Sequence, residues 1–227
     1  MKISPTLTEV KEIAKTGKYD ILPVSCEILS DFITPIEAMR ILQNVSTHCY
    51  LLESAQANEA WGRYTFLGYD PKLEINCIDG HMKLGKLSVE TENPSEYIRQ
   101  ILSEYKSPKF DYLPSFTGGL VGYFSYDYLG YKEKSIRGKA RDTEDFKDVD
   151  LMLFDKVIAF DNLCQKIILI ANMSLDAPET GYNKAIVELK QLRELLMHGE
   201  KKQNMGGKLL GEVTPLFEKE NYCEMVE

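Results

Sequence analysis

Apolar residues along this chain recur at two spacings, one typical of helices and the other of strands. Helical spacing follows two capping boxes, Thr6–Glu9 and Thr34–Glu37, continues after Asn93, and returns over 180–198. Shorter apolar runs bounded by turn residues predict strands. These runs cover residues 21–29, 50–52, 61–69, 72–79, 82–84, 87–89, 151–160 and 167–173. Hairpins alternating with capped helices predict an α+β fold.

Several turns and faces can be predicted within this outline. Asp79–Gly80 predicts a type I′ hairpin turn, whose central residues need positive φ. The apolar run Leu151–Phe160 is expected to form one strand of a hairpin with Ile167–Met173, and the polar stretch 137–148 to be an exposed loop. Asn93 is expected to cap its helix. The inward face of the second helix is predicted to carry Ile36, Met39, Ile41 and Leu42.

Composition narrows the functional classes. Of 227 residues 44% are hydrophobic and 27% are charged, which is ordinary for a soluble globular protein. The net charge of -8 comes without a basic stripe and argues against nucleic-acid binding. Five widely spaced cysteines favour free thiols in a reducing cytoplasm over disulfides or a zinc site. No signal peptide or membrane span is predicted, so we expect no membrane partner.

The most informative stretch is 49–71, CYLLESAQANEAWGRYTFLGYDP. It predicts two strands joined by a polar loop, with Glu53 and Ser54 at a strand end beside aromatic residues. Such a place offers acceptors for an ammonium, donors for a carboxylate and an apolar slot, as a small zwitterion requires. The alternative is a Glu and Ser that merely cap a turn. Arg63 could pair with Glu53 or a ligand carboxylate, although an ordinary surface salt bridge is favoured.

Three strings in order resemble a known family. They are LLES followed by WGRYTFLGYDP, then FTGGLVGYFSYDYLGY at 116–131, and the strand pair within 148–173. Together they resemble the amino-terminal portion of anthranilate synthase component I. The resemblance implies two packed antiparallel sheets with helices outside, part of an α/β/β/α sandwich. Glycines 118, 119 and 122 within the second string predict close backbone approaches.

The resemblance also implies a function. The family converts chorismate and ammonia to anthranilate and pyruvate with Mg²⁺, and a glutamine amidotransferase partner supplies the ammonia. Its acid, base and metal ligands lie in the carboxyl-terminal half, so no catalytic residue and no metal ligand is expected here. Leu52, Glu53 and Ser54 match the positions that bind the feedback inhibitor tryptophan. We therefore expect half of an inhibitor site and no activity from this chain alone.

The resemblance divides the chain into three parts. Residues 1–199 would form the regulatory domain, 200–211 a linker, and 212–227 the start of a chorismate-binding domain that is cut short. Such a fragment would expose strand edges and could self-associate through them. Two alternatives stay open, namely the same part of aminodeoxychorismate synthase component I and a stand-alone module that senses an amino acid.

Overall fold

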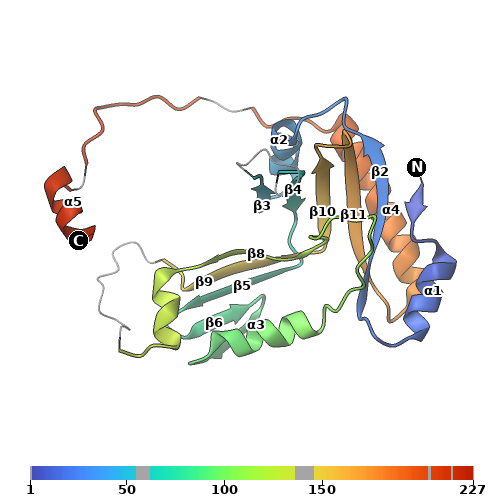
Figure 1. Ribbon diagram of the computed structural model, residues 1–227, viewed down its shortest axis with the longest axis horizontal. Helices are drawn as coiled ribbons and strands as arrows, with labels where there is room; N and C mark the ends of the chain where they lie inside the picture. Colours follow the sequence, from blue (N-terminus) through green and yellow to red (C-terminus); the bar gives the residue numbers. More distant parts are fainter. Residues whose placement is uncertain (1, 55–61, 136–145, 204–205, 216, 227) are drawn as a thin grey trace.

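The computed structural model describes residues 2–54, 62–135, 146–203, 206–215 and 217–226 (Figure 1). The described chain forms two antiparallel sheets with helices, which confirms the predicted α+β class. The six-stranded sheet has the order β1 (Ile3–Ser4), β2 (Ile21–Leu29), β11 (Lys166–Ser174), β10 (Lys156–Asp161), β4 (Tyr64–Tyr69) and β3 (Cys49–Leu52). The five-stranded sheet has the order β7 (Leu87–Glu90), β6 (His81–Leu84), β5 (Leu73–Ile78), β9 (Val149–Phe154) and β8 (Gly119–Phe124).

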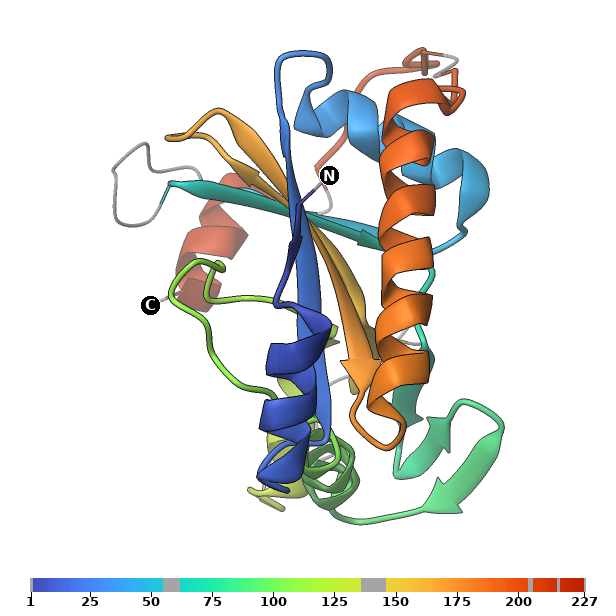
Figure 2. The ribbon, with the colours of Figure 1, turned by 90° about the vertical axis from the view of Figure 1, so that its right-hand side faces the viewer.

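The central strands of the six-stranded sheet are buried on both faces. One face carries the helices α1 (Leu7–Lys15), α2 (Pro35–Val45) and α4 (Pro178–His198), which Figure 2 shows lying over its strands. The other face of β10 and β11 is covered by the segment that carries Phe110, Leu113 and Phe116. Successive residues of these two strands therefore alternate between two apolar environments, and the runs 157–160 and 167–171 within them are apolar.

The five-stranded sheet has a smaller core. Helix α3 (Pro94–Ser103) and the 3₁₀ helix η1 (Tyr126–Tyr131) pack on one of its faces, around Ile75, Met82 and Val149. The Tyr131 hydroxyl accepts a hydrogen bond from the amide of Gly80 (2.7 Å) and donates one to Asp148 Oδ2 (2.6 Å). These bonds tie η1 to the β5–β6 turn and to the start of β9.

The chain crosses between the two sheets at two places. Residues 70–72 connect β4 to β5, and Asp155 alone connects β9 to β10. The prediction of one strand over Leu151–Phe160 was therefore wrong, because its first half belongs to the five-stranded sheet and its second half to the six-stranded sheet. The sequence does not reveal this break, because the residues before and after Asp155 are apolar and buried, and no glycine or proline lies between the two strands.

Local predictions were confirmed at two helix starts and at one turn, and were wrong at the third helix start. Both capping boxes are present, and Asp79 and Gly80 have the positive φ angles that the hairpin turn needs. Asn93 does not cap α3, because its side chain bonds to Glu96 and Ser95 instead of a backbone amide. Ile36 was placed inward but is 60% exposed, since it lies on the face of α2 opposite to the buried residues Ala38, Ile41 and Leu42.

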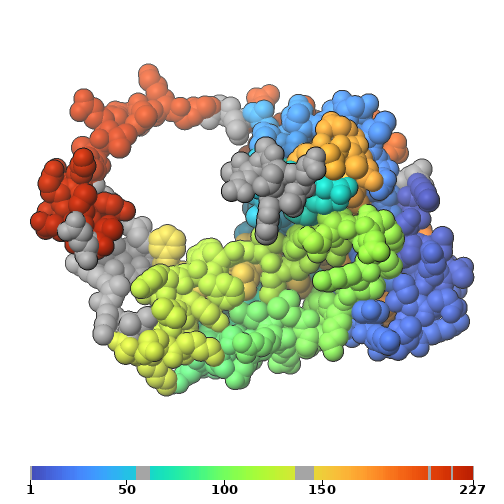
Figure 3. Space-filling view, viewed as in Figure 1, coloured from blue at the N-terminus to red at the C-terminus, as the bar shows by residue number. Residues whose placement is uncertain are grey.

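The remaining segments connect these elements to the end of the chain. Asp148, which was predicted to lie in an exposed loop, is buried. The rest of that predicted loop over 137–145 lies outside the described residues, as do the polar segment 55–59 and Trp61. Beyond residue 199 the chain extends to helix α5 (Lys219–Val226), which has no buried residue and lies apart from the sheets in Figure 3.

Candidate functional site

The residues singled out in the sequence lie at the end of an edge strand. Strand β3 pairs only with β4 in the described chain, with Leu52 opposite Phe66. Glu53 and Ser54 follow directly and are exposed. The two predicted strands are thus present as antiparallel neighbours, and most of the segment predicted to join them lies outside the described residues.

Leu52 lines an apolar groove of about 400 Å³ between the two sheets. Its other walls come from α3, from Phe116, and from strands β8 and β9. The lining residues are Leu52, Ile98, Leu102, Phe116, Leu120, Val121, Gly122, Phe124 and Leu151. Because aliphatic and aromatic side chains dominate, the groove suits an apolar ring better than a charged group.

Aromatic rings continue from the groove along the six-stranded sheet. Phe116 meets Phe66 edge-on, with ring centroids 5.6 Å apart, and Tyr50 meets Phe154 edge-on at 4.7 Å. These edge-to-face contacts fix the ring orientations beside the groove. The sequence had pointed to the aromatic residues of this region, but not to the groove that Phe116 shares with α3.

Tyr50 places a polar group in this apolar region. It is buried, and its hydroxyl has no hydrogen-bond partner in the part of the chain that the structure describes. Burial raises the pKa of this phenol well above its ordinary value, so the group stays protonated and can donate. Gly68 makes room for the ring, because a Cβ there would lie 2.2 Å from Tyr50 Cε1.

The β8 wall depends on a glycine. Gly122 has a φ of 152°, and a Cβ there would lie 2.0 Å from the carbonyl oxygen of Asp150 on β9. A side chain at this position would push β8 away from its neighbour, since the clash is with backbone. The close approach predicted for this glycine is therefore present, and it positions the β8 side of the groove.

Arg63 pairs with Asp161, not with Glu53. Its Nε and Nη2 donate to Asp161 Oδ1 (3.1 Å) and Oδ2 (2.7 Å), and the amides of Leu163 and Cys164 also donate to Oδ1. Burial would raise the pKa of Asp161, but Arg63 and the amide of Cys164 outweigh it and hold the pKa at about 2. The Arg63 guanidinium therefore holds the β10–β11 turn, and its charge is neutralised by Asp161.

The described residues offer little for metal or acid–base chemistry. They contain no group of three His, Cys, Asp or Glu side chains that could hold a metal ion. The three histidines lie apart, each within 3.5 Å of a glutamate: His48 with Glu74, His81 with Glu90, and His198 with Glu194. Over the same part of the chain, no helix combines the length and apolar character needed to cross a bilayer.

Comparison with known proteins identifies the family. Residues 47–227 match the chorismate binding enzyme family. Over 98% of its length the chain is 31% identical to anthranilate synthase component 1 of Acetivibrio thermocellus, and it covers 47% of that protein. It is 36% identical over 83% of its length to the Pseudomonas aeruginosa protein of the same name, covering 39% of it.

One solved structure is also similar to this chain. The crystal structure of anthranilate synthase component I from Streptococcus pneumoniae aligns with 73% of this chain and 36% of that one, at 25% identity and a TM-score of 0.48. The chain thus spans less than half the length of these relatives. From the family match over 47–227, the chain belongs to the chorismate binding enzymes and is similar to anthranilate synthase component 1.

Proposed function

We propose that this chain is the amino-terminal regulatory part of an anthranilate synthase component I and carries one wall of its tryptophan feedback site. The observation that supports the proposal is that Leu52 lines the inter-sheet groove, with Glu53 and Ser54 following it directly at the exposed end of β3. Residues 1–199 would form the regulatory domain, 200–211 the linker, and 212–227 the start of the chorismate-binding domain.

The groove supports an aromatic ligand. Its volume of about 400 Å³ falls within the range of about 300–1,000 Å³ common for small-molecule sites. An indole ring could lie against Leu52 and Phe116, with the β8 side chains beneath it. Glu53 at the strand end supplies a carboxylate for the ligand ammonium, and the Ser54 hydroxyl can bond either charged group.

The carboxylate of a bound amino acid would lack a cationic partner in this arrangement. A free amino acid also presents a carboxylate, and the nearest guanidinium along the chain, that of Arg63, is already held by Asp161. The groove is also open, so a bound ring would stay partly in contact with water. We therefore propose that a longer enzyme containing this chain completes the pocket from another segment.

The isolated chain should bind tryptophan weakly. Losing about 100 Å² of ring burial costs about 2.5 kcal/mol at about 25 cal/mol per Å². One lost charged hydrogen bond brings the deficit to about 4 kcal/mol, or about a thousandfold in affinity relative to a complete site. Titrating the ¹⁵N-labelled chain with tryptophan should shift the amide signals of Leu52 and Leu120. Micromolar affinity would contradict the half-site.

A hydroxyl deletion tests the site in the longer enzyme. Ser54→Ala should weaken tryptophan inhibition by about tenfold or more, because a charged hydrogen bond is worth about 1.5–3 kcal/mol. Uninhibited turnover should stay unchanged. Ser88→Ala, which removes another exposed hydroxyl on β7, is the matched control. Unchanged inhibition in Ser54→Ala, or a large loss of turnover, would count against this assignment.

The chemistry itself would belong to the longer enzyme. The described residues offer no Mg²⁺ ligand set, so we expect the isolated chain to make no anthranilate from chorismate, ammonia and Mg²⁺. In the complete cytoplasmic enzyme a glutamine amidotransferase would supply the ammonia. Product analysis of that enzyme distinguishes anthranilate from aminodeoxychorismate, the product of the alternative family branch. Turnover by the isolated chain would refute the assignment to a regulatory part.

A further inference from the structure

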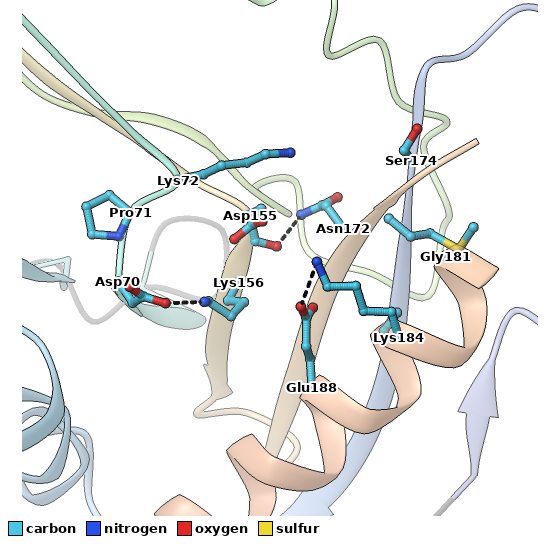
Figure 4. A pocket seen from close by; sticks show the side chains of 12 residues that line it. Asp70, Pro71, Lys72, Asp155, Lys156, Asn172, Ser174, Gly181, Lys184 and Glu188 are labelled. Carbon is cyan, nitrogen blue, oxygen red and sulfur yellow. Dashed lines mark hydrogen bonds and ion pairs between the residues drawn. The ribbon is translucent and has the colours of Figure 1, made fainter. Parts of the chain in front are cut away.

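A second cavity lies where the chain crosses between the sheets. Its volume is about 490 Å³, and it shares no lining residue with the inter-sheet groove. Figure 4 shows its side chains coming from both crossings, from the end of β11 and from α4. Its walls carry three lysines and three carboxylates: Lys72, Lys156, Lys184, Asp70, Asp155 and Glu188.

Four of these six charges are already paired. Lys156 Nζ lies 2.7 Å from Asp70 Oδ2, and Lys184 Nζ lies 3.7 Å from Glu188 Oε1. Both pairs are drawn as dashed lines in Figure 4. Among the described residues, the ammonium of Lys72 and the carboxylate of Asp155, one from each crossing, form no ion pair, although Asp155 also interacts electrostatically with Lys156.

One carboxylate oxygen of Asp155 lacks a donor among the described residues. This atom, Oδ1, is buried. The backbone at this position is fixed, because the Asp155 carbonyl accepts from the amide (2.9 Å) and from Nδ2 (3.0 Å) of Asn172. A buried carboxylate oxygen without a donor is costly, so this group is prepared to accept from an ammonium.

Lys72 lacks an anion. Its ammonium lies 5.4 Å from the ring centroid of Tyr105, and no carboxylate of the described chain forms an ion pair with it. Its backbone amide donates to the carbonyl of Leu153 (2.8 Å), which holds the residue at the crossing. An anionic group in the cavity could take hydrogen bonds from this ammonium without displacing any existing ion pair.

We propose that the cavity binds a small zwitterion of the α-amino-acid class, with its ammonium on Asp155 and its carboxylate on Lys72. An inorganic anion would leave Asp155 without a donor and face three carboxylates. A simple amine would leave Lys72 without an anion. A ligand whose ammonium and carboxylate are attached to the same carbon can satisfy both groups and leaves the net charge of the cavity unchanged.

Nuclear magnetic resonance of the ¹⁵N-labelled 227-residue chain tests the proposal. Each of the common L-amino acids is titrated singly, and at least one should shift the amide signals of Lys72, Asp155 and Asn172. Tryptophan bound in the inter-sheet groove is recognised separately, because it shifts Leu52 and Leu120 instead. If no amino acid shifts the cavity signals, the proposal is wrong, whatever tryptophan does at the groove.

Variants of the protein, and ligand analogues that lack one charged group, test the proposed contacts with Asp155 and Lys72. Asp155→Asn and Lys72→Met should each weaken binding by about tenfold or more, whereas the exposed controls Asp111→Asn and Lys190→Met should not. Starting from the amino acid that binds, the matching hydroxy acid and the matching amine should each bind about tenfold more weakly. Equal binding of either probe would overturn the two-charge assignment, and this test stands even if a variant fails to fold.

Discussion

The two sheets differ in how completely they are covered. The six-stranded sheet is enclosed by α1, α2 and α4 on one face and by the segment around Leu113 on the other. The five-stranded sheet has one small cluster under α3 and η1, and its β8 edge exposes Tyr123 and Phe124. The first sheet is thus a finished core, whereas the second presents apolar surface that a ligand or another surface can bury.

Because of this difference, we expect substitutions in the six-stranded sheet to affect stability and substitutions at the groove to affect ligand binding. Residues that hold the fold lie in the six-stranded sheet, and the inter-sheet groove lies where its cover ends and the β8 edge begins. The second cavity, lined by Lys72 and Asp155, lies where the chain crosses between the sheets. Side chains near an incomplete core can accept a ligand at little cost, because less packing has to be disturbed.

The largest expected effect concerns matched leucines. Leu169 on β11 is fully buried, whereas Leu102 on α3 is 45% exposed and Leu210 is 97% exposed. Leu169→Ala should lower the free energy of unfolding by about 3–5 kcal/mol, Leu102→Ala by about 1 kcal/mol, and Leu210→Ala by almost nothing. Urea denaturation measures all three. Similar losses for Leu169 and Leu102 would erase the contrast between the sheets.

The next effect is confined to the five-stranded sheet. Gly122→Ala should cost about 3 kcal/mol, because its Cβ would clash with the backbone of Asp150 at a positive φ. Gly206→Ala is the control, since nothing lies within 4 Å of that position. Hydrogen exchange should show faster opening of β8 and β9 while β11 stays protected. Uniform loss of protection would mean that the two sheets unfold as one unit.

A third effect depends on pH and belongs to the six-stranded sheet. The folded pKa of Asp161 is about 2, below its ordinary value of 3.8. The carboxylate therefore stabilises the fold fully above about pH 4, and this contribution of about 2 kcal/mol is lost as the pH falls toward 2. Asp161→Asn should flatten the pH dependence of unfolding in that window, whereas Asp111→Asn should not. An unchanged slope in Asp161→Asn would argue against the clamp.

The smallest effect concerns the open edge. Strand β8 has no neighbour on its outer side in the described chain, and Phe124 there is 49% exposed. The chain should self-associate as its concentration rises, and Phe124→Lys should weaken that association by about 1 kcal/mol without lowering stability. Sedimentation velocity measures both. A wild-type chain that stays monomeric at the highest concentrations would contradict self-association through this edge.

The site could be predicted only in part from the sequence. Leu52, Glu53 and Ser54 were singled out because their string resembles a family segment, and the strand end could be predicted from the abrupt change in polarity. Phe116 and Leu120 were not assigned to the same groove, because a contact between β3, α3 and β8 depends on how the sheets are placed. The cavity at the sheet crossings left no sequence signal, since its charges come from three separate segments.

The sequence by itself determined the features that depend on neighbouring residues. Capping boxes, the Asp79–Gly80 turn and the long amphipathic α4 follow from hydrogen bonds and spacings within a few residues. Tertiary structure alone decided that Asp155 separates two sheets and that Arg63 holds Asp161. Burial on both faces removes the alternation that marks a strand, and ion-pair partners distant in sequence leave no periodic signal.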